Sequence, residues 1–99
     1  MPALWVTLYK KISDPSKLSA YAALAVPAIT AGGGQFVARG VAAYAYEGGL
    51  LERTVIISFP SVKAANDTYH SLSYKEALAA LGDGAERDLR IVETVETVA

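Results

Sequence analysis

The sequence predicts an α+β fold in which the chain runs strand, helix, strand, strand, helix, strand. Three observations predict it. Two short segments, residues 4–10 and 53–59, alternate in the period-two pattern of strands. An apolar stripe with helical spacing follows the first segment. Glycine-rich or polar breaks separate the elements, and no long linker or internal repeat divides the 99 residues. We therefore expect one domain that spans residues 1–99.

The first half of the chain contains the first predicted helix between two strands. Asp14 suits the N-cap of a helix and Pro15 suits its first position, so a helix is expected over residues 15–31. Its core-facing stripe recurs every three or four residues and consists of Leu18, Tyr21, Ala22, Ala25 and Ile29. Three glycines then end the helix, and one of them is expected in the left-handed conformation. A second strand is expected over residues 35–46, with a bulge or bend at Gly40.

The second half contains two strands and a helical region that is broken in the middle. A turn at residues 47–49 leads to the strand at 53–59, and the helical region follows it. Ser73 and Glu76 have the spacing of a capping box, which predicts that a separate short helix begins there. The last strand is expected over residues 89–95. This order is the split βαβ pattern of ferredoxin-like folds, in which helices cover one face of a four-stranded antiparallel sheet.

Composition and charge narrow the classes of function. The formal net charge is −1 and the basic residues are scattered, so neither nucleic acid nor an anionic membrane is an expected partner. The chain has no cysteine and one histidine, so no metal site and no cofactor are expected. The start of the chain lacks the features of a signal peptide, and residues 18–31, the longest apolar stretch, fall short of the roughly 20 residues that span a bilayer. A cytoplasmic location is therefore expected.

The distribution of apolar residues predicts a homodimer. With both helical regions on one face of the sheet, the other face is left bare. Several strands nevertheless carry apolar side chains on both faces, and hydrophobic residues make up 53% of the chain against 19% charged residues. No remaining element is available to cover the second face. We therefore expect two copies of the chain to pack sheet against sheet.

Four side chains are candidates for a functional site. Arg39 lies among apolar strand residues, where it either pairs with a carboxylate such as Glu47 at a sheet edge or holds an anionic or carbonyl group of a ligand. His70, the only histidine, is the candidate catalytic acid or base, and a solvent-facing residue at a helix end is the alternative. Tyr69 and Tyr74 flank the helix break. They either line a ligand pocket or belong to the core with their hydroxyl groups at its rim.

Several of these residues belong to motifs that resemble a known family. In chain order, the motifs are Ala38-Arg39-Gly40, Leu51-Glu52-Arg53 leading into Val55-Ile56-Ile57, Ser58-Phe59-Pro60-Ser61 with Ala64-Ala65, Tyr69-x-Ser71-x-x-Tyr74 and Leu89-Arg90-Ile91-Val92-Glu93. Together they resemble the small bacterial family called domain of unknown function 1330, over nearly the whole chain. The resemblance implies a ferredoxin-like fold that pairs into a dimeric α/β barrel, with a distant similarity to the antibiotic-biosynthesis-monooxygenase type of barrel. It implies no established activity.

The sequence departs from the family pattern after the helix break. The Ser-Pro pair that commonly precedes the second tyrosine is Leu72-Ser73 here, and an arginine often found after that tyrosine's helix is absent.

Two functions fit the observations on the sequence. One is the binding or transformation of a small organic molecule in a pocket between sheet and helices, lined by Arg39, Tyr69, His70 and Tyr74. The other is a non-catalytic dimeric domain that has a structural or ligand-sensing role.

Overall fold

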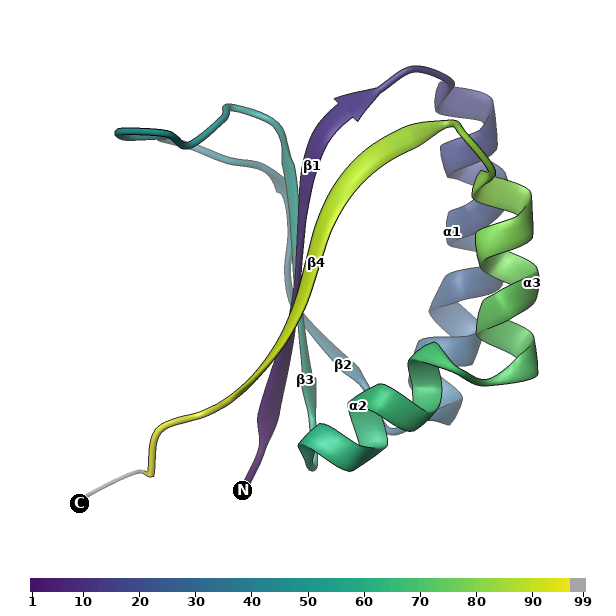
Figure 1. Cartoon of the computed structure of the whole chain (residues 1–99), viewed down its shortest axis with the longest axis vertical. Helices are drawn as coiled ribbons and strands as arrows, with labels where there is room; N and C mark the ends of the chain where they lie inside the picture. Colours follow the sequence, from purple (N-terminus) through teal and green to yellow (C-terminus); the bar gives the residue numbers. More distant parts are fainter. Residues whose placement is uncertain (97–99) are drawn as a thin grey trace.

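Seven elements follow one another over residues 1–96, the part of the chain that this computed structural model describes. They are β1 (Ala3–Ile12), α1 (Pro15–Ala31), β2 (Gln35–Val41), β3 (Arg53–Phe59), α2 (Val62–Tyr69), α3 (Leu72–Leu81) and β4 (Ala85–Glu93). The strands form one antiparallel sheet in the order β2-β3-β1-β4. All three helices lie on the same face of this sheet (Figure 1). The predicted α+β fold of ferredoxin-like type is therefore confirmed.

The core lies between the sheet and the helices, because successive side chains of a strand point to opposite faces. The buried side chains of β1 are Ala3, Trp5, Thr7 and Tyr9. The Trp5 ring stacks on Phe59 with 5.6 Å between the ring centroids, and Tyr74 packs against Trp5 nearly at right angles with 5.1 Å between centroids. The opposite face of β1 carries Leu4, Val6 and Leu8. None of the helices in residues 1–96 covers this face of the sheet (Figure 1).

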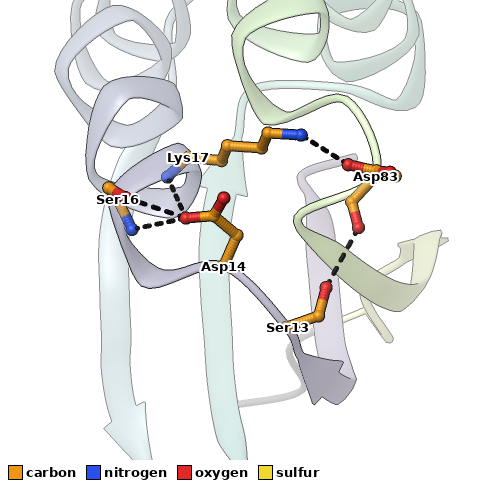
Figure 2. Close-up of polar contacts among 5 residues, drawn as sticks. All are labelled: Ser13, Asp14, Ser16, Lys17 and Asp83. Atoms are coloured by element: carbon orange, nitrogen blue, oxygen red, sulfur yellow. Dashed lines mark hydrogen bonds and ion pairs between the residues drawn. The ribbon is translucent and has the colours of Figure 1, made fainter.

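Polar contacts fix the junction between β1 and α1 and tie it to the turn before β4 (Figure 2). Asp14 caps α1 as expected, because its carboxylate accepts hydrogen bonds from the backbone amides of Ser16 at 3.1 Å and Lys17 at 3.2 Å. The Lys17 ammonium lies 2.6 Å from the Asp83 carboxylate. The Ser13 hydroxyl donates to the backbone carbonyl oxygen of Asp83 at 3.1 Å. These contacts hold the start of α1 beside the start of β4.

The break in the second helical region lies earlier than the capping box predicts. Ser71 is the N-cap of α3, since its hydroxyl oxygen accepts a hydrogen bond from the backbone amide of Tyr74 at 3.2 Å. The same hydroxyl donates to the carbonyl oxygen of Thr68 in the last turn of α2 at 2.7 Å. The prediction of a cap at Ser73 is wrong, because Ser71 has the extended backbone of a cap and Ser73 lies inside the helix.

Three strands have bounds that differ from the expected ones, and β1 is longer at both ends than residues 4–10. β2 ends at Val41, earlier than expected, because its partner β3 begins at Arg53, with which Val41 pairs. Residues 42–52 instead form a loop that projects on the side of the sheet away from the helices (Figure 1). β4 begins at Ala85, earlier than expected, because β1 extends to Ile12 and offers it a partner. No helix among residues 1–96 is long and apolar enough to cross a membrane.

Candidate functional site

A cavity of about 30 Å³ lies between α1 and the helix-facing side of the sheet. Its walls are mostly apolar and include Ala22, Ala25 and Val26 of α1 and Trp5, Val55 and Ile57 of the sheet. One water molecule needs about 10–15 Å³ of such space. The cavity therefore has room for about two water molecules, or for one small polar group of a larger molecule.

Three arginines from three different strands line this cavity. They are Arg39 of β2, Arg53 of β3 and Arg87 of β4. No aspartate or glutamate lines it. None of the three guanidinium groups forms an ion pair with a carboxylate among residues 1–96. The positive charge of the cavity is therefore not balanced by the described part of the protein.

A β-bulge directs Arg39 toward this cavity. The register of β2 against β3 shifts between Phe36 and Ala38, which leaves Val37 as the extra residue of the bulge. Phe36 pairs with Ile57 and Arg39 pairs with Val55, so both side chains point to the helix-covered face. Without the extra residue they would point to opposite faces. The prediction of a bulge at Gly40 is wrong, because Gly40 pairs regularly with Thr54 and the bulge lies three residues earlier.

Arg53 lies next to Tyr9 in a row across the sheet. Thr54 pairs with Leu8, so Arg53 and Tyr9 are the next residues on these two antiparallel strands. Tyr9 in turn pairs with Arg87 on its other side. The Arg53 Nε atom is buried and has no hydrogen-bond partner among the described residues. An arginine donor in this state is unusual, because buried polar atoms are nearly always hydrogen-bonded.

Two tyrosine rings hold the Arg87 guanidinium in place. Its Cζ atom lies 5.7 Å from the ring centroid of Tyr9 and 4.8 Å from that of Tyr21. Its Nη1 atom donates a hydrogen bond to the Tyr21 hydroxyl oxygen at 3.0 Å. Burial works against the Arg87 charge, but the nearby oxygens of Tyr21 and Tyr74 outweigh it and raise the Arg87 pKa. Arg87 is therefore a fixed positive charge at the cavity.

The predicted site residues Tyr69 and Tyr74 lie in the core beside the cavity rather than on its wall. Tyr74 is fully buried, and its hydroxyl oxygen lies 2.6 Å from that of Tyr21. Burial raises the Tyr74 pKa, so the phenol stays neutral. Tyr69 is half-buried and packs against Trp5 and Tyr74, with 5.8 Å and 5.4 Å between ring centroids. Neither tyrosine lines the cavity.

The predicted catalytic candidate, His70, lies in a different place. It is the C-cap of α2, it is exposed, and its Nδ1 atom is 2.9 Å from the carbonyl oxygen of Asn66. With Tyr69 it lines an open groove against β4 that does not include Arg39. The structure therefore brings Arg39 together with two other arginines, but not with His70.

Arg53 and Arg87 are not among the predicted site residues, although the sequence pattern of β3 already indicated the position of Arg53. Val55, Ile57 and Phe59 form the buried face of β3, and the period of two places Arg53 on that same face. No such pattern pointed to Arg87, because the expected last strand began after it. Its position depends on the pairing of Tyr9 with the start of β4.

Residues 2–95 match the family described as domain of unknown function, DUF1330. The chain belongs to the DUF1330 family. No curated protein matches it. Within this DUF1330 chain, the motif Tyr69-x-Ser71-x-x-Tyr74 is built into the fold: Ser71 caps α3, and the two tyrosines pack around Trp5.

Several solved structures share the fold of this DUF1330 chain. A protein of unknown function from Rhodopseudomonas palustris is 16% identical, with a TM-score of 0.76 over 97% of this chain and 84% of that one. SnoaB, a cofactor-independent oxygenase from Streptomyces nogalater, is 13% identical, with a TM-score of 0.65 over 98% and 96%. A Caulobacter crescentus protein named for the antibiotic biosynthesis monooxygenases is 18% identical, with a TM-score of 0.59 over 96% and 90%. At these identities the likeness shows a common fold.

Proposed function

We propose that this DUF1330 domain binds a small organic molecule in the cavity between α1 and the sheet. The observation that carries the proposal is the buried Arg53 Nε atom, which has no hydrogen-bond partner among the described residues although it lines a mostly apolar cavity. A buried donor without a partner costs about 1–3 kcal/mol. Binding sites accept such a cost, because the ligand supplies the missing partner.

The position of Arg39 supports the same proposal. Its Cζ atom lies 4.7 Å from the ring centroid of Phe36, and its side chain is exposed at the edge strand of the sheet. It forms no ion pair with Glu47 or any other described carboxylate. Arg39 thus provides free hydrogen-bond donors at the outer end of the cavity. A ligand that enters there meets Arg39 before it reaches Arg53.

A larger hollow on the other face of the sheet fits this role less well. It measures about 440 Å³ and lies beneath the loop of residues 42–52. The charged residues that line it have both signs, Lys10 on one side and Glu52 and Asp88 on the other. Since Asp88 already pairs with Arg90 at 2.9 Å, Lys10 and Glu52 remain as one charge of each sign, and the hollow has no excess of positive charge that would attract an anion. Its position on the uncovered face makes it part of a surface for association instead.

We further propose that the protein forms a homodimer through this uncovered face. Val6, Ile56 and Val92 share the face, since Val6 pairs with Ile56 and Val92 lies beside Leu4. Val92 is 52% exposed. The loop that projects over the same side carries Tyr44 and Tyr46, which are 79% and 75% exposed (Figure 1). Apolar surface gathered in this way is typical of an interface between subunits.

Light scattering at micromolar concentration tests the dimer. We expect a mass of twice the 10.4 kDa of one chain. A single species of 10.4 kDa would contradict the proposal.

Ligand binding is tested by a thermal-shift screen of small organic acids, amides and phenols, with and without a cavity-filling variant. Ala22 lines the cavity, whereas its neighbour Ala23 is exposed on the outer face of the same helix. Both Ala22→Leu and Ala23→Leu add the same three carbon atoms to α1 and change helix propensity little. We expect Ala22→Leu to abolish the stabilisation that a ligand gives, and Ala23→Leu to retain it.

Two results would overturn the binding proposal. One is a screen in which no compound stabilises the wild-type protein, which would favour a non-catalytic dimeric domain. The other is a ligand that stabilises Ala22→Leu as well as the wild type while circular dichroism shows both to be folded. That ligand would bind elsewhere on the protein.

A further inference from the structure

We propose that the cavity binds the carboxylate group of a small organic anion, with Arg53 and Arg87 as its partners and Arg39 at its entrance. This inference rests on the proposed binding function, because it names the class of ligand for the same cavity. It is carried by the charges, the size and the wall chemistry of the cavity.

The charges favour an anion over a neutral ligand. Three guanidinium groups line the cavity and no carboxylate does. A partly buried positive charge is costly unless an opposite charge or several hydrogen bonds compensate it. Arg87 meets part of this need through the Tyr21 hydroxyl oxygen at 3.0 Å, but Arg53 Nε has no partner among residues 1–96. An anion supplies both the opposite charge and the acceptor that Arg53 Nε lacks, whereas a neutral ligand supplies only the acceptor.

The size of the cavity favours a carboxylate over a larger anion. A cavity of about 30 Å³ takes about two water molecules, and the two oxygen atoms of one carboxylate replace two waters. The planar fork of an arginine matches the planar carboxylate, with which it forms two parallel hydrogen bonds. A tetrahedral phosphate carries four oxygen atoms and needs more space.

The apolar walls of the cavity indicate that the part of the ligand that carries the carboxylate is itself apolar. Apart from the arginines, the cavity is bounded largely by aliphatic and aromatic side chains, such as Val26, Ile29 and Phe36. Because the cavity itself holds only the polar group, the rest of the ligand lies at the entrance. There the Arg39 guanidinium lies over the Phe36 ring, with its Cζ atom 4.7 Å from the ring centroid, and Arg39 is exposed, so a planar apolar group can stack on the outer face of the guanidinium.

Calorimetric titration with matched ligands tests the inference. Benzoate and benzamide have the same shape and differ in charge, so they separate an anion site from a general aromatic site. Inorganic phosphate at the same ionic strength separates carboxylate binding from binding of any anion. We expect the wild-type protein to bind benzoate at least tenfold more tightly than either benzamide or phosphate.

Two variants connect the binding to Arg53. Arg53→Met keeps most of the apolar stem and removes the donors. It should weaken benzoate binding at least tenfold and benzamide binding by a smaller factor, because benzamide loses only a hydrogen bond to a neutral acceptor. Lys75→Met removes one positive charge from the exposed face of α3, away from the cavity, and should leave both affinities unchanged. Circular dichroism shows whether each variant is folded. Arg53→Lys, which keeps the charge but not the fork, replaces Arg53→Met if that variant unfolds.

The possible results distinguish this inference from the proposed function. Equal affinities for benzoate and benzamide would overturn the carboxylate inference and leave the binding function intact. Phosphate that binds as tightly as benzoate would overturn it in favour of a general anion site. An Arg53→Met protein that binds benzoate like the wild type would place the anion elsewhere. If no compound of either charge binds, both the inference and the proposed function fail.

Discussion

The hydroxyl oxygen atoms of Tyr21 and Tyr74 lie 2.6 Å apart, in a hydrogen bond that joins α1 to α3 inside the core. Their rings meet edge to face, with 6.0 Å between centroids and an angle of 82°. Tyr21 also accepts a hydrogen bond from Arg87 at 3.0 Å. One chain of contacts therefore runs from the fully buried Tyr74 to a charged residue of the cavity, and it couples the stability of the fold to the arrangement of the site.

Removing either hydroxyl group should destabilise the protein, but to different extents. Tyr21→Phe leaves both the buried Tyr74 hydroxyl and the Arg87 guanidinium without their partner, so we expect it to cost about 2–4 kcal/mol of unfolding free energy. Tyr74→Phe removes one bond while Tyr21 still accepts from Arg87, so about 1 kcal/mol is expected. Urea denaturation of the two variants measures the difference. A larger loss in Tyr74→Phe would contradict this account of the network.

The raised pKa of Tyr74 predicts how stability depends on pH. Burial moves this pKa above its ordinary value of 10.0. Above pH 10 the unfolded chain loses a proton that the folded protein keeps, so the folded state binds more protons and becomes less favoured as pH rises. One such group lowers the unfolding free energy by up to about 1.4 kcal/mol per pH unit. Denaturation between pH 9 and pH 11 should show a shallower decline in Tyr74→Phe than in the wild type, and equal slopes would show that Tyr74 does not contribute.

Adjacent isoleucines of β3 should respond in opposite ways to the same substitution. Ile57 is 1% exposed in the core, whereas Ile56 lies on the uncovered face of the sheet. Ile57→Asp buries an unpaired carboxylate and should cost on the order of 4 kcal/mol or more, which unfolds a domain of this size. Ile56→Asp should give a folded protein of half the wild-type mass. Circular dichroism and light scattering of both variants measure these outcomes, and a dimeric Ile56→Asp protein would place the interface elsewhere.

The cap of α3 can be tested with a pair of serines that lie two residues apart. Ser71→Ala should destabilise the protein by about 1 kcal/mol, because the Tyr74 amide loses its acceptor. Ser73→Ala should change stability by less than about 0.5 kcal/mol, since Ser73 is exposed and caps no amide. Thermal or urea denaturation separates the two, and the reverse order would restore the capping box at Ser73.

The fold was predictable from the sequence because its local patterns agree with its long-range contacts. The alternation in β1, the Asp14-Pro15 start of α1 and the buried face of β3 each indicated the observed element. Strand ends were predicted less well. An end depends on where the partner strand stops, as the pairs Val41–Arg53 and Ile12–Ala85 show, and local patterns do not contain this information.

The candidate site was less predictable than the fold, for a related reason. Arg39 stood out because it lies among apolar residues, but the bulge at Val37 that turns it toward the cavity has no clear signature in the sequence. Arg87 reaches the cavity only through the pairing of β4 with Tyr9. Tyr69 and His70 are adjacent in the sequence at the break between α2 and α3. Tyr69 nevertheless packs against the core, whereas His70 faces solvent.

The side-chain Nε–H resonance of Arg53 tests the central claim most directly. In a ¹H–¹⁵N spectrum of the arginine Nε–H groups, assigned with Arg53→Lys, benzoate is added while the ionic strength is held constant. We predict that the Arg53 signal shifts progressively to saturation, because the carboxylate becomes the partner that this buried atom lacks. Arg90, already bonded to Asp88 at 3.0 Å on the other face, should not move. An Arg53 signal that stays fixed at saturating benzoate would contradict the account.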